Sequence, residues 1–191
     1  MCIRDRPTID QRAWTYSVPA DDPAGLIAVS SAGRVVRLPA TTLGGTEVTK
    51  IEVSPDGTRL LVLVRRVAES VATVAGIQRS ADGTPTGLST DQYPLTVPSG
   101  KATDATWIDD ASVAILTSGN DGSDTVTAQQ VGGLTTPIGR LSNATSIVGT
   151  SSKVDLRARD TTGNVLEPST SAVWQNVFPT AVDVDVLAVQ R

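Results

Sequence analysis

The chain has no histidine and a single cysteine, Cys2, among 191 residues. Histidine is the commonest general base near neutral pH and the commonest metal ligand. Its absence rules out a Ser-His-Asp triad and disfavours catalytic zinc sites. One cysteine rules out a disulfide within the chain. A large share of hydrolytic and metal-dependent chemistry is therefore excluded.

Basic residues are also fewer than acidic residues. The chain has 16 Lys and Arg residues against 20 Asp and Glu residues, which gives a net charge of -4 and a pI near 4.8. A negative overall field repels polyanions, and binding to nucleic acid depends on neutralising phosphates with basic residues. The composition predicts that nucleic acid is not a partner.

The N-terminus lacks a recognisable targeting sequence. It begins Met-Cys-Ile-Arg-Asp-Arg, with no apolar run and no small-residue cleavage site. A lipid-anchor motif needs an apolar stretch before the cysteine, and only Met1 precedes Cys2. We interpret residues 1–6 as a non-native leader and expect the true beginning of the protein, with any anchor, to be missing from this chain.

Turn-forming residues, by contrast, are plentiful along the whole chain. The 16 glycines and 11 prolines separate short runs of Val, Ile, Leu and Thr, which is typical of many strands joined by tight turns. Hydrophobic residues make up 39% and charged residues 19%, as in ordinary globular proteins. The composition predicts an all-β fold.

The clearest structural unit is expected near residues 48–93. Its segment Ser54-Pro55-Asp56-Gly57 fits a hairpin turn, because proline presets φ, aspartate accepts bonds from the backbone ahead and glycine tolerates positive φ. The next strand is apolar at every position from Leu60 to Val64, which predicts burial on both faces. Two further strands, one over residues 71–78 and a looser one ending at residue 88, bring the unit to four strands.

Similar units are expected near residues 102–140 and 144–178. Asp109 follows Asp56 by 53 residues and Val148 follows Trp107 by 41, close to the ~40–50 residue period of propeller blades. A hairpin over residues 26–38 is interpreted as the remnant of an earlier unit. The sequence therefore predicts, within residues 7–191, a partial β-propeller of four-stranded antiparallel blades, about three blades plus a remnant.

Three motifs carry a resemblance to a known family. They are Ser54-Pro55-Asp56-Gly57-Thr58-Arg59-Leu60, then Val74-Ala75-Gly76-Ile77-Gln78-Arg79, then Trp107-Ile108-Asp109-Asp110. In this order and spacing they resemble the C-terminal propeller of the actinobacterial lipoprotein LpqB family, over most of residues 26–178.

The resemblance implies a protein on the outer face of the cytoplasmic membrane, in the cell envelope. It implies a lipid anchor and a preceding GerMN-type domain, both absent from this chain. It also implies association with the extracytoplasmic domain of the MtrB sensor kinase, and through it a part in two-component signalling and envelope homeostasis.

Several acidic residues are candidates for chemical sites. The segment 120–124 loosely resembles a calcium loop but lacks the required order of carboxylates and the distal Glu, so a solvated loop is favoured. Asp109 and Asp110 are adjacent and point in different directions, which favours a turn over a glycosidase pair. No local motif supports Glu69 or Glu167, and the alternation around Asp183 and Asp185 predicts a half-exposed edge strand.

The remaining candidates have structural interpretations. Packing between blades is favoured over ligand binding for the three tryptophans, Trp14, Trp107 and Trp174. The Gly-Gly pairs at 44–45 and 132–133 lack the spacing and lysine of a phosphate-binding loop, and the sequon at 143–145 is a chance match. No catalytic, cofactor-binding or metal-binding residue is assigned, and no cofactor is predicted.

Two classes of function remain open. The first is a non-catalytic interaction and sensing module, in which loops at one face of the propeller bind a partner protein. The alternative is a propeller hydrolase of the glycosidase or peptidase class with carboxylates converging on an axial channel. The interaction module is preferred, and the chain is predicted not to be an enzyme.

Overall fold

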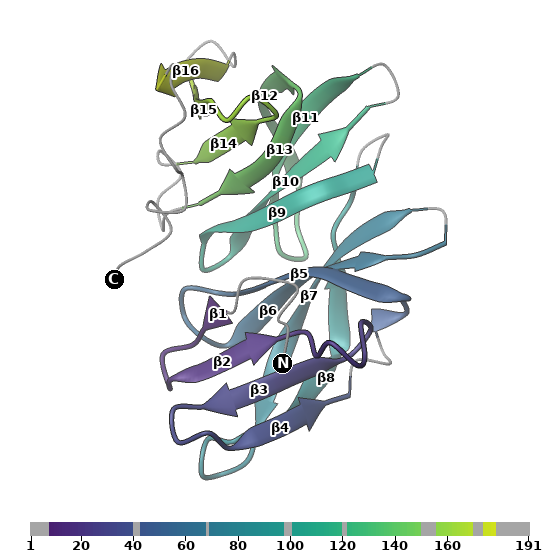
Figure 1. Cartoon of the computed structure of the whole chain (residues 1–191), viewed down its shortest axis with the longest axis vertical. Helices are drawn as coiled ribbons and strands as arrows, with labels where there is room; N and C mark the ends of the chain where they lie inside the picture. The colour runs from purple at the N-terminus through teal and green to yellow at the C-terminus, as the bar shows by residue number, and fades with distance from the viewer. Residues whose placement is uncertain are drawn as a thin grey trace. The chain divides into compact units, whose positions relative to one another are not determined.

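A computed structural model describes residues 8–39, 43–67, 69–97, 101–119, 122–149, 156–169 and 174–178. These residues form sixteen strands in four antiparallel sheets of four strands each, coloured from purple to yellow along the chain in Figure 1. Within them, no helix has the length and apolar character needed to cross a membrane. The chain divides into two compact units, Met1–Leu95 (unit 1) and Thr96–Arg191 (unit 2).

Unit 1 contains two sheets in which each strand pairs with the next along the chain. The first consists of β1 (Thr8–Ile9), β2 (Trp14–Ser17), β3 (Leu26–Ser30) and β4 (Val35–Leu38). The second consists of β5 (Glu47–Val53), β6 (Arg59–Arg65), β7 (Ser70–Arg79) and β8 (Pro85–Pro94). The interpretation of the hairpin at residues 26–38 as a remnant is therefore corrected: it belongs to a complete four-stranded sheet, because β1 and β2 precede it.

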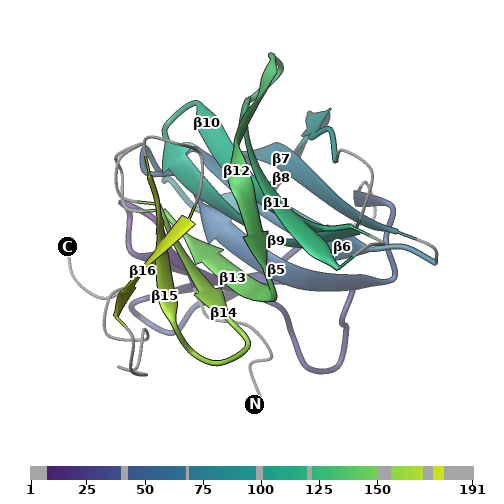
Figure 2. The same cartoon turned by 90° about the horizontal axis from the view of Figure 1, so that it is seen from above.

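Unit 2 repeats this arrangement. Its first sheet consists of β9 (Lys101–Asp109), β10 (Ser112–Ser118), β11 (Ser123–Gln130) and β12 (Thr135–Ser142). Its second consists of β13 (Ala144–Val148), β14 (Arg157–Asp160), β15 (Val165–Pro168) and β16 (Trp174–Phe178), with β13, β14 and β15 side by side in Figure 2. The prediction of an all-β fold built from four-stranded antiparallel blades is confirmed.

The cores lie between the two sheets of each unit. In unit 1, Tyr16 and Leu26 of the first sheet cluster with Ile51, Leu60 and Val62 of the second. All five residues from Leu60 to Val64 are at most 3% exposed, so the predicted burial of β6 on both faces is confirmed. In unit 2, a second cluster joins the sheet of β9–β12 to that of β13–β16 and includes Leu116, Ile147 and Trp174.

Glycines with positive φ close the predicted hairpin turns. Gly57 has φ 70° and Gly83 has φ 82°, values that an L-residue with a Cβ rarely adopts. Gly33 and Gly163 occupy the equivalent place in the β3–β4 and β14–β15 turns, with φ 81° and 87°. The turn predicted at Gly57 is therefore confirmed, and three further hairpins have a glycine with positive φ at the same place.

Candidate interaction surface

Four turns meet at one end of unit 1. They are the β1–β2 turn (10–13), the β3–β4 turn (31–34), the β5–β6 turn (54–58) and the β7–β8 turn (80–84), and the first two are visible at the left of this unit in Figure 1. The Gln11 side chain donates to the carbonyl of Pro55 at 2.8 Å, and Arg34 donates to the Thr84 hydroxyl at 3.1 Å. Side chains thus link turns of different sheets into one surface, which we call the turn surface.

The β5–β6 turn is held by its own side chains. Asp56 accepts from the Ser54 hydroxyl at 2.5 Å and from the backbone N–H and hydroxyl of Thr58 at 3.1 and 2.9 Å. Burial raises the pKa of Asp56, but these hydrogen bonds and the nearby charge of Arg59 together bring that pKa below its usual value. The carboxylate is therefore used to fix the turn.

The β7–β8 turn has the same construction. Asp82 accepts from the Ser80 hydroxyl at 2.5 Å and from the Thr84 backbone N–H and hydroxyl at 3.1 and 3.0 Å. The hydrogen bond from Ser80, followed by those from Thr84, lowers the pKa of Asp82 to about 2. Asp82 consequently stays ionised and the turn stays closed over the physiological pH range.

A buried carboxylate lies beneath the turn surface. Asp10 accepts from the backbone N–H groups of Arg12 and Trp14 at 2.8 and 3.0 Å and from the Tyr16 hydroxyl at 2.9 Å. It also forms an ion pair with Arg79, in which the Asp10 side chain is 0% exposed and that of Arg79 is 14% exposed. Each of these partners of the Asp10 carboxylate is thus a hydrogen-bond donor.

The electrostatics of this group follow from burial and its partners. Burial raises the pKa of Asp10, but the hydrogen bonds from Trp14, Arg79, Tyr16 and Arg12 outweigh it and lower that pKa below the usual value. Burial, together with the hydrogen bond to and the charge of Asp10, raises the pKa of Tyr16. The group is therefore an ionised carboxylate held by a neutral phenol and a guanidinium.

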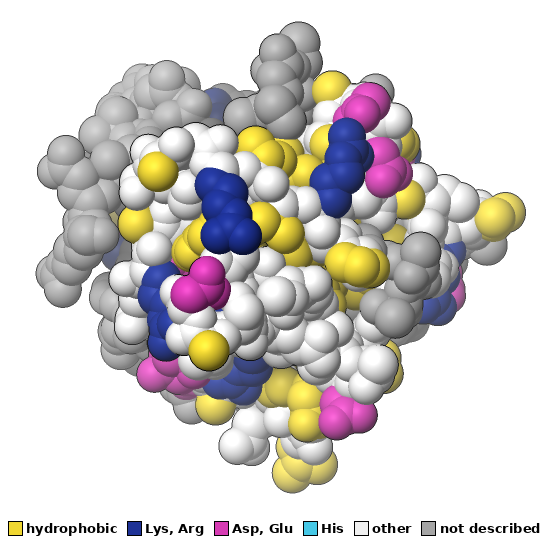
Figure 3. Space-filling view, turned by 90° about the horizontal axis from the view of Figure 1, so that it is seen from below, with side chains coloured by type: hydrophobic (Ala, Val, Ile, Leu, Met, Phe, Trp, Pro, Cys, Tyr) yellow, Lys and Arg dark blue, Asp and Glu magenta, His cyan; other side chains and the backbone are white. Residues whose placement is uncertain are grey.

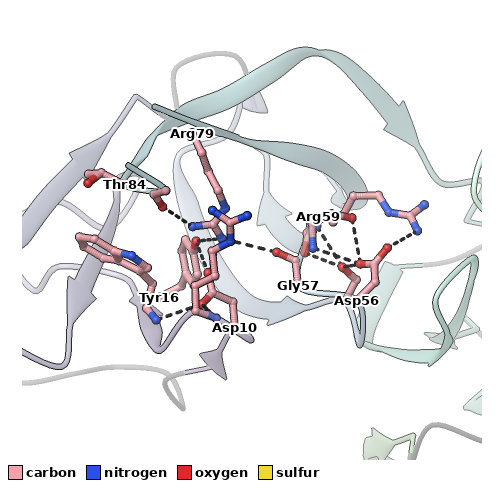
Figure 4. Close-up of polar contacts among 12 residues, drawn as sticks. Asp10, Tyr16, Asp56, Gly57, Arg59, Arg79 and Thr84 are labelled. Atoms are coloured by element: carbon pink, nitrogen blue, oxygen red, sulfur yellow. Dashed lines mark hydrogen bonds and ion pairs between the residues drawn. The ribbon is translucent and has the colours of Figure 1, made fainter. Parts of the chain in front are cut away.

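Arg79 extends this group to two further turns. Its guanidinium donates to the Gly83 carbonyl at 3.0 Å. It also donates to the Gly57 carbonyl at 3.5 Å and to the Tyr16 hydroxyl at 3.0 Å, and Figure 4 shows Arg79 beside these two residues. The backbones of three of the four turns are therefore tied to a single buried ion pair.

In unit 2, buried side chains connect the two sheets. Asp104 accepts from the Ile147 backbone N–H at 2.8 Å, and Asp124 accepts from the Ala144 N–H at 2.7 Å and the Ser118 hydroxyl at 2.7 Å. Two backbone N–H groups of β13, those of Ala144 and Ile147, thus find their hydrogen-bond acceptors in the neighbouring sheet. These carboxylates also serve the fold.

The acidic residues singled out from the sequence fall into three groups. Residues 120–121, 183 and 185 lie outside the described residues. Asp109 accepts from the backbone N–H of Ala111 at 2.9 Å, which confirms the predicted turn. Glu69 pairs with Arg66 at 3.5 Å and Glu167 with Arg157 at 2.5 Å, so these glutamates neutralise neighbouring arginines.

The other candidates are also used in packing and turns. The three tryptophans are between 2% and 8% exposed, and Trp14 and Trp174 belong to the cores between the sheets of their units, as expected. Gly132 has φ 74° in the β11–β12 turn. Asn143 has φ 58°, and the Thr145 hydroxyl donates to the carbonyl of Arg159 at 3.1 Å. Cys2 lies outside the described residues.

The group around Asp10 is the feature that sequence reasoning missed. β1 has two residues and β2 has four, too short for a periodic pattern. The only signal in the sequence was a carboxylate followed closely by Trp14 and Tyr16, with Arg79 immediately before a Ser-x-Asp-Gly turn. Within the described residues, no group of three potential metal ligands occurs.

Comparison with known proteins bears on the whole chain. The family model for the lipoprotein LpqB beta-propeller domain matches residues 5–186. No curated protein sequence matches the chain significantly.

Among solved structures, streptogramin B lyase is similar with a TM-score of 0.60 and 14% identity, over 91% of this chain and 54% of that one. The AofleA mutant from Arthrobotrys oligospora is similar with a TM-score of 0.56 and 12% identity, over 92% and 57%. Hydrazine synthase of Kuenenia stuttgartiensis is similar with a TM-score of 0.54 and 16% identity, over 84% of this chain and 51% of that one.

The chain spans about half the length of these solved structures, and at such identities the likeness concerns the fold alone. The family match covers nearly the whole sequence and agrees with the four-stranded blades. The chain belongs to the LpqB β-propeller domain family.

Proposed function

We propose that this chain is the non-catalytic interaction and sensing module of an envelope lipoprotein. Its partner is the extracytoplasmic domain of a sensor kinase, whose signalling it modulates in the service of envelope homeostasis. The parent protein is held at the outer face of the cytoplasmic membrane by a lipid anchor. Membership of a family described as a lipoprotein propeller supports the envelope location.

The observation that carries the proposal is the turn surface of unit 1. Its turns are joined by the Gln11–Pro55 and Arg34–Thr84 hydrogen bonds and fixed from below by the Asp10–Arg79 pair. A surface held in one conformation loses little conformational entropy on binding a partner. Such a surface suits protein recognition, for which loops on a rigid propeller are a common solution.

The hydrolase alternative requires carboxylates free to act as acid and base. The buried Asp10, Asp104 and Asp124 instead accept hydrogen bonds from backbone N–H groups, which hold these carboxylates in fixed positions within the fold. This use of the acidic residues favours the interaction module.

The test is a binding measurement on the full-length lipoprotein. We expect the purified extracytoplasmic domain of the sensor kinase to bind it saturably and in defined stoichiometry, measured by isothermal calorimetry. An unrelated kinase sensor domain serves as the control. Absence of binding would overturn the partner assignment, and turnover of simple glycosides or peptides, lost on substitution of carboxylates, would overturn the non-catalytic assignment.

A further inference from the structure

Three arginines converge on the β7–β8 turn of unit 1. An ideal Cβ at Gly83 would lie 2.6 Å from Nη1 of Arg12, so the Arg12 guanidinium lies directly over this glycine. Arg34 donates to the Thr84 hydroxyl at 3.1 Å, and Arg79 donates to the Gly83 carbonyl at 3.0 Å. Three guanidinium groups, two from turns and one from the end of β7, therefore lie against two adjacent residues.

The charges of this cluster do not balance. Arg79 is neutralised by the buried Asp10. Arg34 lies 3.8 Å from Asp82, and both side chains are more than 60% exposed, a geometry in which an ion pair is weak and exchangeable. Within the described residues, the exposed guanidinium of Arg12 has no anionic partner. The exposed part of the cluster thus has two guanidinium groups and one carboxylate.

This local excess of positive charge occurs in a protein with a net charge of -4. On the face drawn in Figure 3, basic and acidic side chains lie in small neighbouring groups without a broad patch of either sign. Salt screens interactions beyond ~8–10 Å, so only an anion brought close to the cluster experiences its field. An extended polyanion or an anionic membrane would meet the negative charge of the rest of the molecule.

We propose that Arg12 and Arg34 bind an acidic segment of a partner protein at the turn surface. Guanidinium groups bind carboxylates through paired, charge-assisted hydrogen bonds. Arg34 would exchange its weak contact with Asp82 for a partner carboxylate, while Arg12 gains one. Gly83 permits this arrangement, because a side chain there would occupy the position of the Arg12 guanidinium. The inference rests on the proposed function and names the chemistry of its surface.

The probe for this proposal is a fluorescein-labelled hexaglutamate peptide, whose anisotropy is measured with the whole chain at ~50 mM salt. The test variant is R12Q/R34Q. The control variant is R37Q/R65Q, which removes the same charge from two arginines of unit 1 that are 63% and 59% exposed and that, unlike Arg12, are each paired with a carboxylate. A third variant, R12K/R34K, keeps the charge but not the planar donor geometry.

We expect hexaglutamate to bind the wild type, and binding to weaken about tenfold in R12Q/R34Q and by less than about twofold in R37Q/R65Q. R12K/R34K should bind more weakly than wild type because lysine lacks the paired donors. Circular dichroism should show all three variants folded, since the substituted side chains are exposed.

Several results would overturn the proposal. They are the absence of hexaglutamate binding to the wild type, an equal loss in the two glutamine variants, and unchanged binding in R12Q/R34Q. Binding of phosphatidylglycerol vesicles in place of the peptide, with the same sensitivity to R12Q/R34Q, would assign the surface to a membrane instead. The peptide experiment contains no kinase, so its failure is distinguishable from failure of the kinase domain to bind.

Discussion

Arg79 and Asp10 are 69 residues apart in the sequence and form an ion pair in which the carboxylate is completely buried. Arg79 ends β7 and Asp10 follows β1, so the pair joins the two sheets of unit 1. The same guanidinium contacts the carbonyls of Gly57 and Gly83. One interaction therefore contributes both to the joining of the sheets and to the placement of the turns.

Removal of the negative charge of this pair should destabilise unit 1. In D10N, the Arg79 guanidinium is left largely buried without a counterion, a change that costs about 3 kcal/mol or more. Urea denaturation followed by tryptophan fluorescence measures the free energy of unfolding. D21N is the matched control, since Asp21 pairs with Arg37 on the surface with both side chains more than 60% exposed, and it should leave the midpoint nearly unchanged. Equal effects of the two substitutions would contradict this account.

The raised pKa of Tyr16 predicts a loss of stability in alkali. The folded state keeps the phenol protonated above the ordinary tyrosine pKa of 10.0, whereas the unfolded state releases that proton near pH 10. Above pH 10 the free energy of unfolding should therefore decrease with a contribution of up to ~1.4 kcal/mol per pH unit. This contribution is fully present below pH 10 and is lost as pH rises toward the folded pKa.

The alkaline effect should be absent from Y16F, which has no proton to lose at this position. Y93F is the control, because Tyr93 is the other tyrosine and is 46% exposed, and it should retain the wild-type slope. Urea midpoints measured from pH 9 to pH 11 test the comparison. A wild-type slope in Y16F would show that another group is responsible.

Substitution of two glycines that have the same backbone conformation can distinguish backbone strain from steric contact with a neighbouring side chain. Gly33 and Gly83 have φ values of 81° and 82°, and a Cβ at Gly33 would meet nothing within 4 Å, whereas one at Gly83 would lie 2.6 Å from the end of the Arg12 side chain. G33A and G83A should each lower the free energy of unfolding by about 1 kcal/mol, because alanine is unfavourable in the left-handed backbone conformation.

The two alanine variants should nevertheless differ in hexaglutamate affinity. In G83A the flexible Arg12 side chain must move off the turn, so binding should weaken, while G33A should bind like the wild type. Thermal melts and peptide anisotropy on both variants provide the two measurements. A much larger loss of stability in G83A would indicate that the Arg12 side chain is held more rigidly than its exposure implies.

In unit 2, Asp124 of the β9–β12 sheet should be sensitive to substitution. D124A leaves the Ala144 N–H and the Ser118 hydroxyl without their acceptor, at a cost of about 2–3 kcal/mol for buried groups. The unfolding free energy of the whole chain, followed through tryptophan fluorescence, measures this loss. D160A affects a turn whose carboxylate bonds lie partly in solvent and should have a smaller effect.

The sequence could predict the features that arise from local pattern. The unbroken apolar run of β6 and the Ser-x-Asp-Gly turns locate strands and hairpins, because each depends on neighbouring residues. β1 and β2 are too short to show periodicity, and Asp10 meets Arg79 only after both sheets have formed. The turn surface therefore could not be predicted from the sequence, because it depends on contacts between residues that are far apart along the chain.

In the Ser54–Thr58 and Ser80–Thr84 turns, the serine and aspartate side chains bond the backbone of their own turn, and the threonine hydroxyls donate to the aspartates. The residue between serine and aspartate is Pro55 in one turn and Ala81 in the other. Its side chain takes no part in these hydrogen bonds, and both residues are exposed to solvent. Variation at Ala81, and at Pro55 by residues that keep its φ, can consequently change what the surface recognises while the hairpins keep their shape. Related proteins could in this way diverge in partner choice through single substitutions, and the same two positions are suitable for randomisation in a library of engineered binders.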